Sequence, residues 1–98
     1  MKNPQSQNSP ESDASRRTVE RVQTGVRLEK RVLQVLKGLA EYLGISLGDL
    51  LEGICLHTFE GKLPFGDETL ERIGNLRLVY DLDLVAADSH LLTDPSTE

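Results

Sequence analysis

The chain has little of several features that define other classes of protein. It contains one cysteine, Cys55, which excludes an intrachain disulfide and fits a reducing compartment. No apolar run approaches the roughly 20 residues of a membrane-spanning helix, and no signal-peptide core follows the first residues. Residues 1–15 carry almost no apolar side chain. We therefore expect a cytoplasmic protein with no membrane partner and a disordered N-terminal arm over residues 1–17.

Charge is unevenly distributed along the chain. The net charge is −5, yet residues 14–45 hold seven bases and three acids, whereas residues 46–98 hold three bases and eleven acids. This asymmetry predicts a basic contact surface and a separate acidic portion. The alternative is that the basic side chains only solvate the face of a helix. The overall negative charge therefore does not exclude a nucleic-acid partner.

Two hydrophobic periods follow one another after the N-terminal arm. Residues 18–28 alternate between apolar and polar side chains, which predicts a short, half-buried β-strand. From Glu29 to Leu43 the apolar residues fall on about half of a helical wheel. That pattern predicts an amphipathic helix, which Gly44 ends in a left-handed cap.

Two further helices are predicted downstream. Ser46 is a suitable N-cap for a helix that runs to about Glu60 and is terminated by Gly61. Asp67 is a suitable N-cap for a third helix over residues 68–80. The apolar residues of this third helix are able to cover part of the surface of the other two.

The single predicted strand has no partner within its own chain. Unpaired strand edges are unfavourable, and pairing with the same strand of a second copy about a twofold axis satisfies them. Leu56 and Phe59 lie off the buried stripe of the second predicted helix. They are therefore candidates for contacts between chains or with the C-terminal region.

A family resemblance follows from this order of elements. Its most telling part is the linkage Gly44-Ile45-Ser46, which begins 17 residues after Arg27. With it, residues 22–59 resemble the core of ribbon-helix-helix DNA-binding proteins of the MetJ/Arc type. The resemblance covers about 38 of the 98 residues.

The resemblance implies a particular fold and division of the chain. The expected fold is mostly α with one short β-strand. Two chains form an intertwined homodimer through a two-stranded antiparallel ribbon. Residues 18–61 then make the ribbon-helix-helix domain. Residues 62–98 add an acidic, helical C-terminal extension with a frayed end.

The resemblance also implies a function, that of a bacterial transcription regulator that binds double-stranded DNA. The polar face of the ribbon is expected in the major groove, where Arg can bind guanine and Gln can bind adenine through two hydrogen bonds each. Gly25 departs from the family pattern because it offers no side chain for base recognition. The alternative for this face is an ordinary solvated strand. The candidate base-contacting residues are Arg21, Gln23, Gly25 and Arg27.

Phosphate contacts are expected from two other places. The N-terminus of the second helix, at Ser46, Leu47 and Gly48, presents free backbone N–H groups and a favourable dipole to an anion. Arg16 and Arg17 are able to reach the DNA backbone or minor groove from the N-terminal arm. For Ser46, helix capping alone is the alternative role, and for the two arginines it is solubility.

No catalytic, cofactor or metal site is expected. Cys55 and His57 are two residues apart on a predicted helix, so their side chains point in different directions. No phosphate-binding glycine loop, zinc spacing or paired nucleophile and base is found. A loose C-terminal cluster is a weak metal candidate and consists of Asp81, Asp83, Asp88 and His90. We therefore expect a protein that is not an enzyme.

Two other functions remain open at this point. The acidic residues 62–98 are able to bind a partner protein, as the tail of an antitoxin does. Alternatively, the chain is a structural dimer that has lost DNA binding, an interpretation favoured by Gly25 and by the net acidity.

Overall fold

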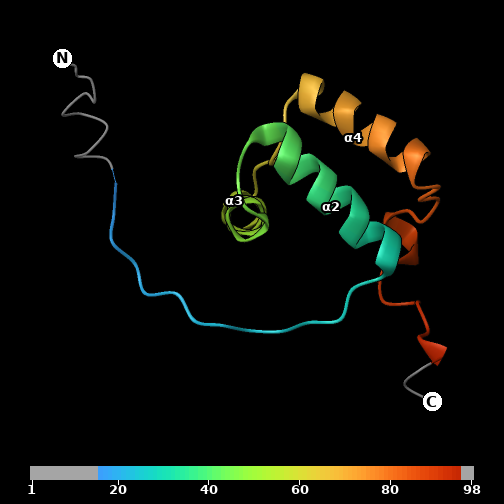
Figure 1. Cartoon of the computed structure of the whole chain (residues 1–98), viewed down its shortest axis with the longest axis horizontal. Coiled ribbons are helices and arrows are strands. Elements are labelled where there is room, and N and C mark those ends of the chain that lie inside the picture. The colour runs from blue at the N-terminus through green and yellow to red at the C-terminus, as the bar shows by residue number, and fades with distance from the viewer. Residues whose placement is uncertain (1–15, 96–98) are drawn as a thin grey trace.

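The computed structural model describes residues 16–95 of the chain. They contain the helices α2 (Lys30–Leu43), α3 (Leu47–Phe59) and α4 (Asp67–Val79), followed by the short 3₁₀ helix η1 (Ala86–Asp88). Helix α2 lies between the other two helices: α4 runs alongside it, and α3 crosses it near its C-terminal end (Figure 1). The predicted disordered arm, residues 1–17, lies outside the described residues except for its last two, which are exposed.

Helix α2 has well-defined caps at both ends. The Glu29 carboxylate accepts hydrogen bonds from the backbone N–H groups of Arg31 and Val32, at 2.8 and 3.0 Å. At the other end Gly44 adopts a left-handed conformation with φ 72°, and its N–H bonds to the Glu41 carbonyl. The predicted helix and its glycine cap are confirmed.

Helix α3 begins as its cap residue predicts. The Ser46 hydroxyl accepts a hydrogen bond of 3.0 Å from the backbone N–H of Asp49. The helix ends at Phe59, and Gly61 follows with φ 75°. The predicted start and end of this helix are therefore confirmed to within one residue.

The small core lies where α3 and α4 meet α2. It consists of Leu39 and Ala40 from α2 and Leu50 from α3. On its other side α4 brings Ile73 and Leu76 against α2. The packed partly buried side chains complete it: Leu36, Ile54, Phe65, Ile73 and Leu76.

Gly38 of α2 lies directly against Leu76 of α4. A Cβ atom at this position would lie 2.8 Å from a terminal methyl carbon of Leu76. The sequence places Gly38 on the polar half of the α2 wheel, so periodicity alone does not reveal that α4 packs there. Helix α4 itself is predicted correctly, but Gly66 precedes it as N-cap and Asp67 is its first residue, so the prediction of Asp67 as N-cap is wrong.

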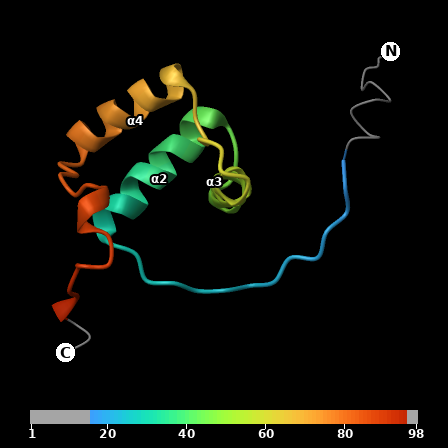
Figure 2. The ribbon, with the colours of Figure 1, turned by 180° about the vertical axis from the view of Figure 1, so that it is seen from behind.

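After α4 the chain turns back towards the start of α2 (Figure 2). One guanidinium nitrogen of Arg31 donates to the Asp81 carbonyl at 2.9 Å and to the Asp83 carboxylate at 3.1 Å. Leu82, between these two residues, is buried. Arg77 adds a hydrogen bond of 3.0 Å to the Leu84 carbonyl. Residues 81–84 are therefore anchored on the helices.

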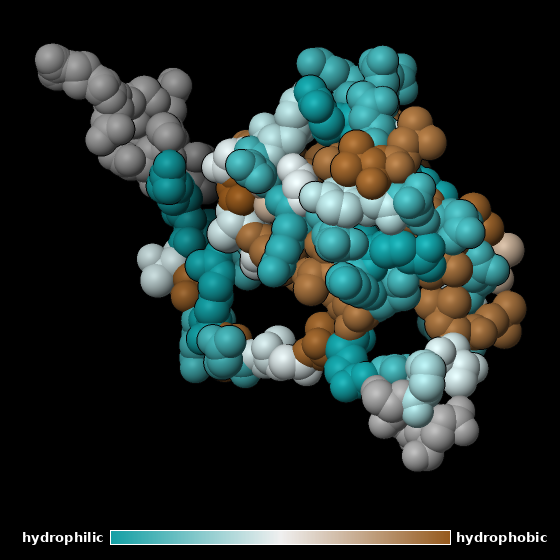
Figure 3. Space-filling view, turned by 45° about the vertical axis from the view of Figure 1, so that its right-hand side comes forward, coloured by the Kyte–Doolittle hydropathy of each residue, from teal (hydrophilic) through white to brown (hydrophobic). Residues whose placement is uncertain are grey.

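The predicted β-strand and intermolecular ribbon are contradicted. Residues 16–95 contain no strand: residues 16–28 are extended and exposed, and they form no β-ladder within this part of the chain. Val22 and Val26, expected on a buried face, are 77% and 74% exposed. Figure 3 shows open space between this segment and the helices. The fold of the described residues is three helices and an extended leading segment, not a mostly α fold with a strand paired in an intertwined homodimer.

The physical reason lies in how each structure satisfies its backbone. A helix closes its hydrogen bonds within a few residues, whereas an extended segment needs a second strand for the same purpose. Residues 18–28 have the side-chain alternation of a strand, but alternation does not supply that second strand. Alternation of side chains alone is therefore not sufficient to form a β-strand.

Candidate nucleic-acid interface

The extended residues 16–28, called here the basic segment, carry most of the predicted contact residues. Four arginines and one acid lie along it, and every side chain is exposed. The arginines are Arg16, Arg17, Arg21 and Arg27. The segment spans the side of the molecule away from α4 before it joins α2 (Figure 1). Its cations therefore lie on the surface of the molecule.

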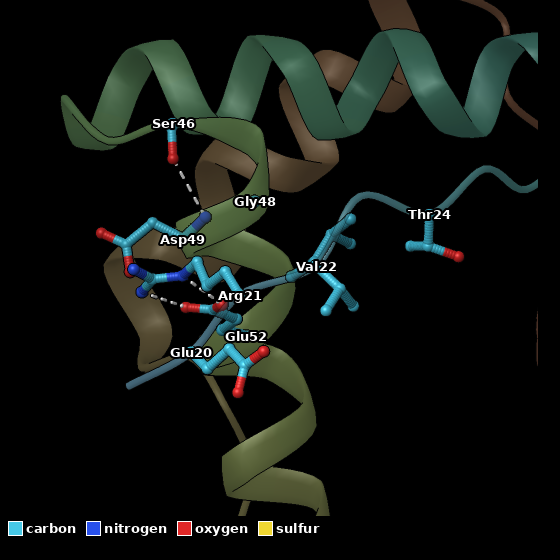
Figure 4. A pocket seen from close by; sticks show the side chains of 9 residues that line it. Glu20, Arg21, Val22, Thr24, Ser46, Gly48, Asp49 and Glu52 are labelled. Carbon is cyan, nitrogen blue, oxygen red and sulfur yellow. Dashed lines mark hydrogen bonds and ion pairs between the residues drawn. The ribbon is translucent and has the colours of Figure 1, made fainter. Parts of the chain in front are cut away.

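Arg21 holds the middle of the basic segment to α3. Its Nε lies 2.7 Å from Oε2 of Glu52, and its Nη2 lies 2.8 Å from Oε1, so the pair is bidentate (Figure 4). The hydrogen bond from Arg21 lowers the pKa of Glu52 and the same bond raises that of Arg21. Because 67% of the arginine side chain is exposed, solvent and salt weaken this contact.

A cleft of about 720 Å³ separates this part of the basic segment from the start of α3. Three carboxylates, those of Glu20, Asp49 and Glu52, line it together with the Arg21 guanidinium (Figure 4). Its electrostatics therefore do not favour a phosphate between the segment and the helix.

The predicted phosphate site lies at the N-terminus of α3, which is capped by Ser46. The Ser46 hydroxyl accepts the Asp49 N–H, which is the capping role that the sequence left open for it. Gly48 is exposed and Leu47 is half-buried. The phosphate contacts of Ser46, Leu47 and Gly48 stay predictions.

Arg27 is held near the end of the basic segment that joins α2. Its guanidinium forms an ion pair with the Asp94 carboxylate. Around this pair, residues 27–30 and 92–95 line a second cleft of about 680 Å³. Two of the four predicted base-contacting residues, Arg21 and Arg27, therefore each bind a carboxylate of their own chain.

The other two predicted base-contacting residues differ in what they offer. Gln23 is exposed, so its amide faces solvent. A Cβ atom at Gly25 would meet nothing within 4 Å, and its φ is not in the left-handed region. No steric requirement for glycine exists there, and the position offers no side chain for recognition.

Sequence reasoning missed the acidic partners of the two arginines. Glu52 and Asp94 are 31 and 67 residues away from Arg21 and Arg27. The separation of charge between the halves of the chain was a signal for such pairing, since opposite charges in one molecule attract. It could not indicate which acid meets which base.

The structure also bears on the weak metal candidates and on the expected lack of a membrane-spanning helix. His57 Nδ1 lies 2.7 Å from the Gly53 carbonyl of its own helix, and Cys55 is exposed. Within residues 16–95 no three His, Cys, Asp or Glu side chains come together as metal ligands would. No helix in the same range has the length and apolar character needed to cross a membrane.

Comparison with known proteins gives no relative for this arrangement. The chain matches no protein-family model, no curated protein and no solved structure. The resemblance to ribbon-helix-helix proteins therefore stays a prediction from the sequence, and its implication for the fold is the one contradicted above.

Proposed function

We propose that this chain binds double-stranded DNA sequence-specifically as a homodimer and acts as a cytoplasmic, nucleoid-bound transcription regulator. The observation that carries the proposal is the basic segment: four arginines along thirteen extended, exposed residues. An extended polypeptide with arginines fits a DNA groove, and arginine-bearing arms are a known means of contacting the minor groove. No β-ribbon is required for this mode of binding.

Each residue class on the segment has a separate task in this proposal. Arg16 and Arg17 neutralise phosphates, which supplies affinity without sequence information. Gln23 and Arg27 reach base edges in the major groove, where each bidentate contact contributes about 1–3 kcal/mol of discrimination. The exposed pairs of Arg21 and Arg27 with carboxylates contribute little in water, so exchanging a carboxylate for an acceptor group of the DNA costs little.

A second copy is proposed because the core of one chain is small. Of the described residues, five hydrophobic side chains are buried, while sixteen large hydrophobic ones are exposed. Leu56 and Phe59, at the end of α3, are 64% and 78% exposed and line one shallow pocket. Such surfaces in a small domain favour association. Dimerisation also doubles the number of arginines that meet the DNA.

The test is a titration of labelled duplex DNA selected from a random-sequence library, at two salt concentrations. Wild type is expected to bind with an affinity that falls steeply as salt rises. Gln23→Ala is expected to lose about 1–3 kcal/mol of discrimination between selected and scrambled duplex. Arg17→Gln is expected to weaken both duplexes equally and to reduce the salt slope by about one unit.

Lys37→Gln is the charge-matched control, since Lys37 is exposed on α2 and outside the basic segment. Lys37→Gln should leave the discrimination between selected and scrambled duplex unchanged. Sedimentation at micromolar concentration should show a dimer. Failure to select any duplex at low salt would refute DNA binding, and a monomer would refute the second copy.

A further inference from the structure

Two segments of opposite charge approach each other at the start of α2. The basic segment, residues 16–28, has four arginines and a single acid. Residues 81–95, called here the acidic segment, have four aspartates and no lysine or arginine. Both segments meet α2 at the same end, as the two opposite views show (Figures 1 and 2). Their charges are complementary where they meet.

Specific contacts fix this approach. Arg31, in the first turn of α2, binds the Asp81 carbonyl and the Asp83 carboxylate, and Leu82 is buried beside them. Further along, Asp94 forms its ion pair with Arg27, and residues 92–95 face residues 27–30 across a shared cleft. The start of the acidic segment is therefore anchored on the helices, and its end reaches the basic segment.

The pair that closes this arrangement is exposed. The side chains of Arg27 and Asp94 are 70% and 45% exposed. At the anchor Arg31 is 34% and Asp83 84% exposed, but Arg31 also binds the Asp81 carbonyl and Leu82 is buried beside it. An exposed ion pair is weak and is screened by salt. It can therefore open without unfolding the helices, while the anchor at Arg31 stays in place.

We propose that the end of the acidic segment is an autoinhibitory contact in which Asp94 competes with DNA for Arg27. A carboxylate and the O6 and N7 atoms of guanine each present an arginine with two acceptor atoms, so Asp94 and a base edge compete for the same N–H donors of Arg27. DNA binding at Arg27 then requires residues 91–95 to leave the basic segment. This inference rests on the proposed DNA binding and states how that binding is restrained.

The first experiment compares the DNA affinity of wild type, Asp94→Asn and a chain ended after His90. Removing the competing carboxylate is expected to tighten binding about twofold to fivefold at low salt, the range for an exposed ion pair. The shortened chain should gain at least as much. Both gains should shrink as salt rises. Glu71→Gln on α4 makes the same change in net charge away from the basic segment, so its gain should be smaller.

A double-mutant cycle separates this contact from a general effect of charge. In an Arg27→Gln background, Asp94→Asn should raise DNA affinity no more than Glu71→Gln does, because Asp94 acts mainly by occupying Arg27. If the gain persists in that background, the acidic segment repels DNA as a whole and the autoinhibitory pair is refuted.

A measurement without DNA tests whether the contact exists at all. Limited trypsin digestion of the full chain should cut after Arg27 faster in Asp94→Asn than in wild type. The rate of cutting after Arg21 serves as the internal reference. Unchanged cutting after Arg27 would overturn the contact, whatever the DNA affinity shows.

The outcomes also keep the two proposals apart. If wild type binds DNA and Asp94→Asn binds it equally well, autoinhibition is refuted and DNA binding stands. If none of these proteins binds duplex at low salt, the DNA-binding proposal fails and autoinhibition fails with it.

Discussion

The helical body, α2 to α4, and the basic segment are two parts of one chain with opposite physical character. In the helical body Leu39 and Leu50 are 2% exposed, and each helix closes its own backbone hydrogen bonds. In the basic segment every side chain is exposed, and Arg21 and Arg27 hold it through exposed ion pairs. The body is therefore held by burial, which salt barely affects, and the segment by charge, which salt screens.

The helical body therefore provides the stability of the fold, whereas the basic segment carries the site proposed for DNA binding. A region with few buried contacts opens at low free-energy cost, whereas a core opens only with the whole domain. The same weakness makes the basic segment able to change partners, from carboxylates of its own chain to phosphates. Changes in the body should therefore alter unfolding, and changes in the segment should alter binding.

The largest expected effect comes from the core. Leu39→Ala removes the most deeply buried large side chain, and we expect it to lower the free energy of unfolding by about 2–5 kcal/mol. Val22→Ala, on the exposed basic segment, is expected to change it by less than about 0.5 kcal/mol. Urea unfolding followed by far-UV circular dichroism measures both. Equal losses in the two variants would show that the segment is part of the folded core.

The helical body was largely predictable from the sequence, for local reasons. The Ser46 cap, the Gly44 cap and the amphipathic period of α2 each depend on residues within a few positions of one another. The side of α2 on which α4 packs was not predictable. Gly38 falls on the polar half of the α2 wheel, yet it lies against Leu76 of α4 because it has no side chain. The strand over residues 18–28 failed because it depends on a partner that no local pattern specifies.

The next effect tests how α4 joins the body. Gly38→Leu places a side chain where a Cβ alone would come within 2.8 Å of Leu76, and we expect a loss of about 1–3 kcal/mol from overpacking. Gly74→Leu is the matched control, since nothing lies within 4 Å of a Cβ at that position in α4. There the gain in helix propensity should stabilise by several tenths of a kcal/mol, up to about 0.8. Urea unfolding again measures both, and stabilisation by Gly38→Leu would show that α4 does not pack on that face.

The candidate interface was less predictable than the helices. The sequence identified the basic residues and their exposure, since alternation and charge are local properties. It could not identify the carboxylates at Glu52 and Asp94, because those contacts bring together residues far apart along the chain. The restraint on the arginines is therefore visible only in the folded molecule.

The smallest effect is the pH dependence of the Arg21–Glu52 pair. The hydrogen bond from Arg21 lowers the pKa of Glu52 below its ordinary value of 4.5. Because the pKa of Glu52 is lowered, the ion pair holds the basic segment on α3 fully above pH 4.5. This stabilisation is lost as the pH falls through the lowered pKa. NMR titration of the Glu52 carboxyl carbon should give a midpoint below 4.5.

Variants at the two arginines of the basic segment that form ion pairs show whether that midpoint reports the Arg21–Glu52 pair. Arg21→Gln removes the cause and should return the Glu52 pKa towards 4.5. Arg27→Gln removes a cation of the same segment that pairs with Asp94 instead, so it should leave the Glu52 titration unchanged. An identical Glu52 midpoint in wild type and Arg21→Gln would mean that the segment does not rest on α3 in solution. The basic segment would then be held at Arg27 and not at Arg21, which would make the contrast between body and segment sharper still.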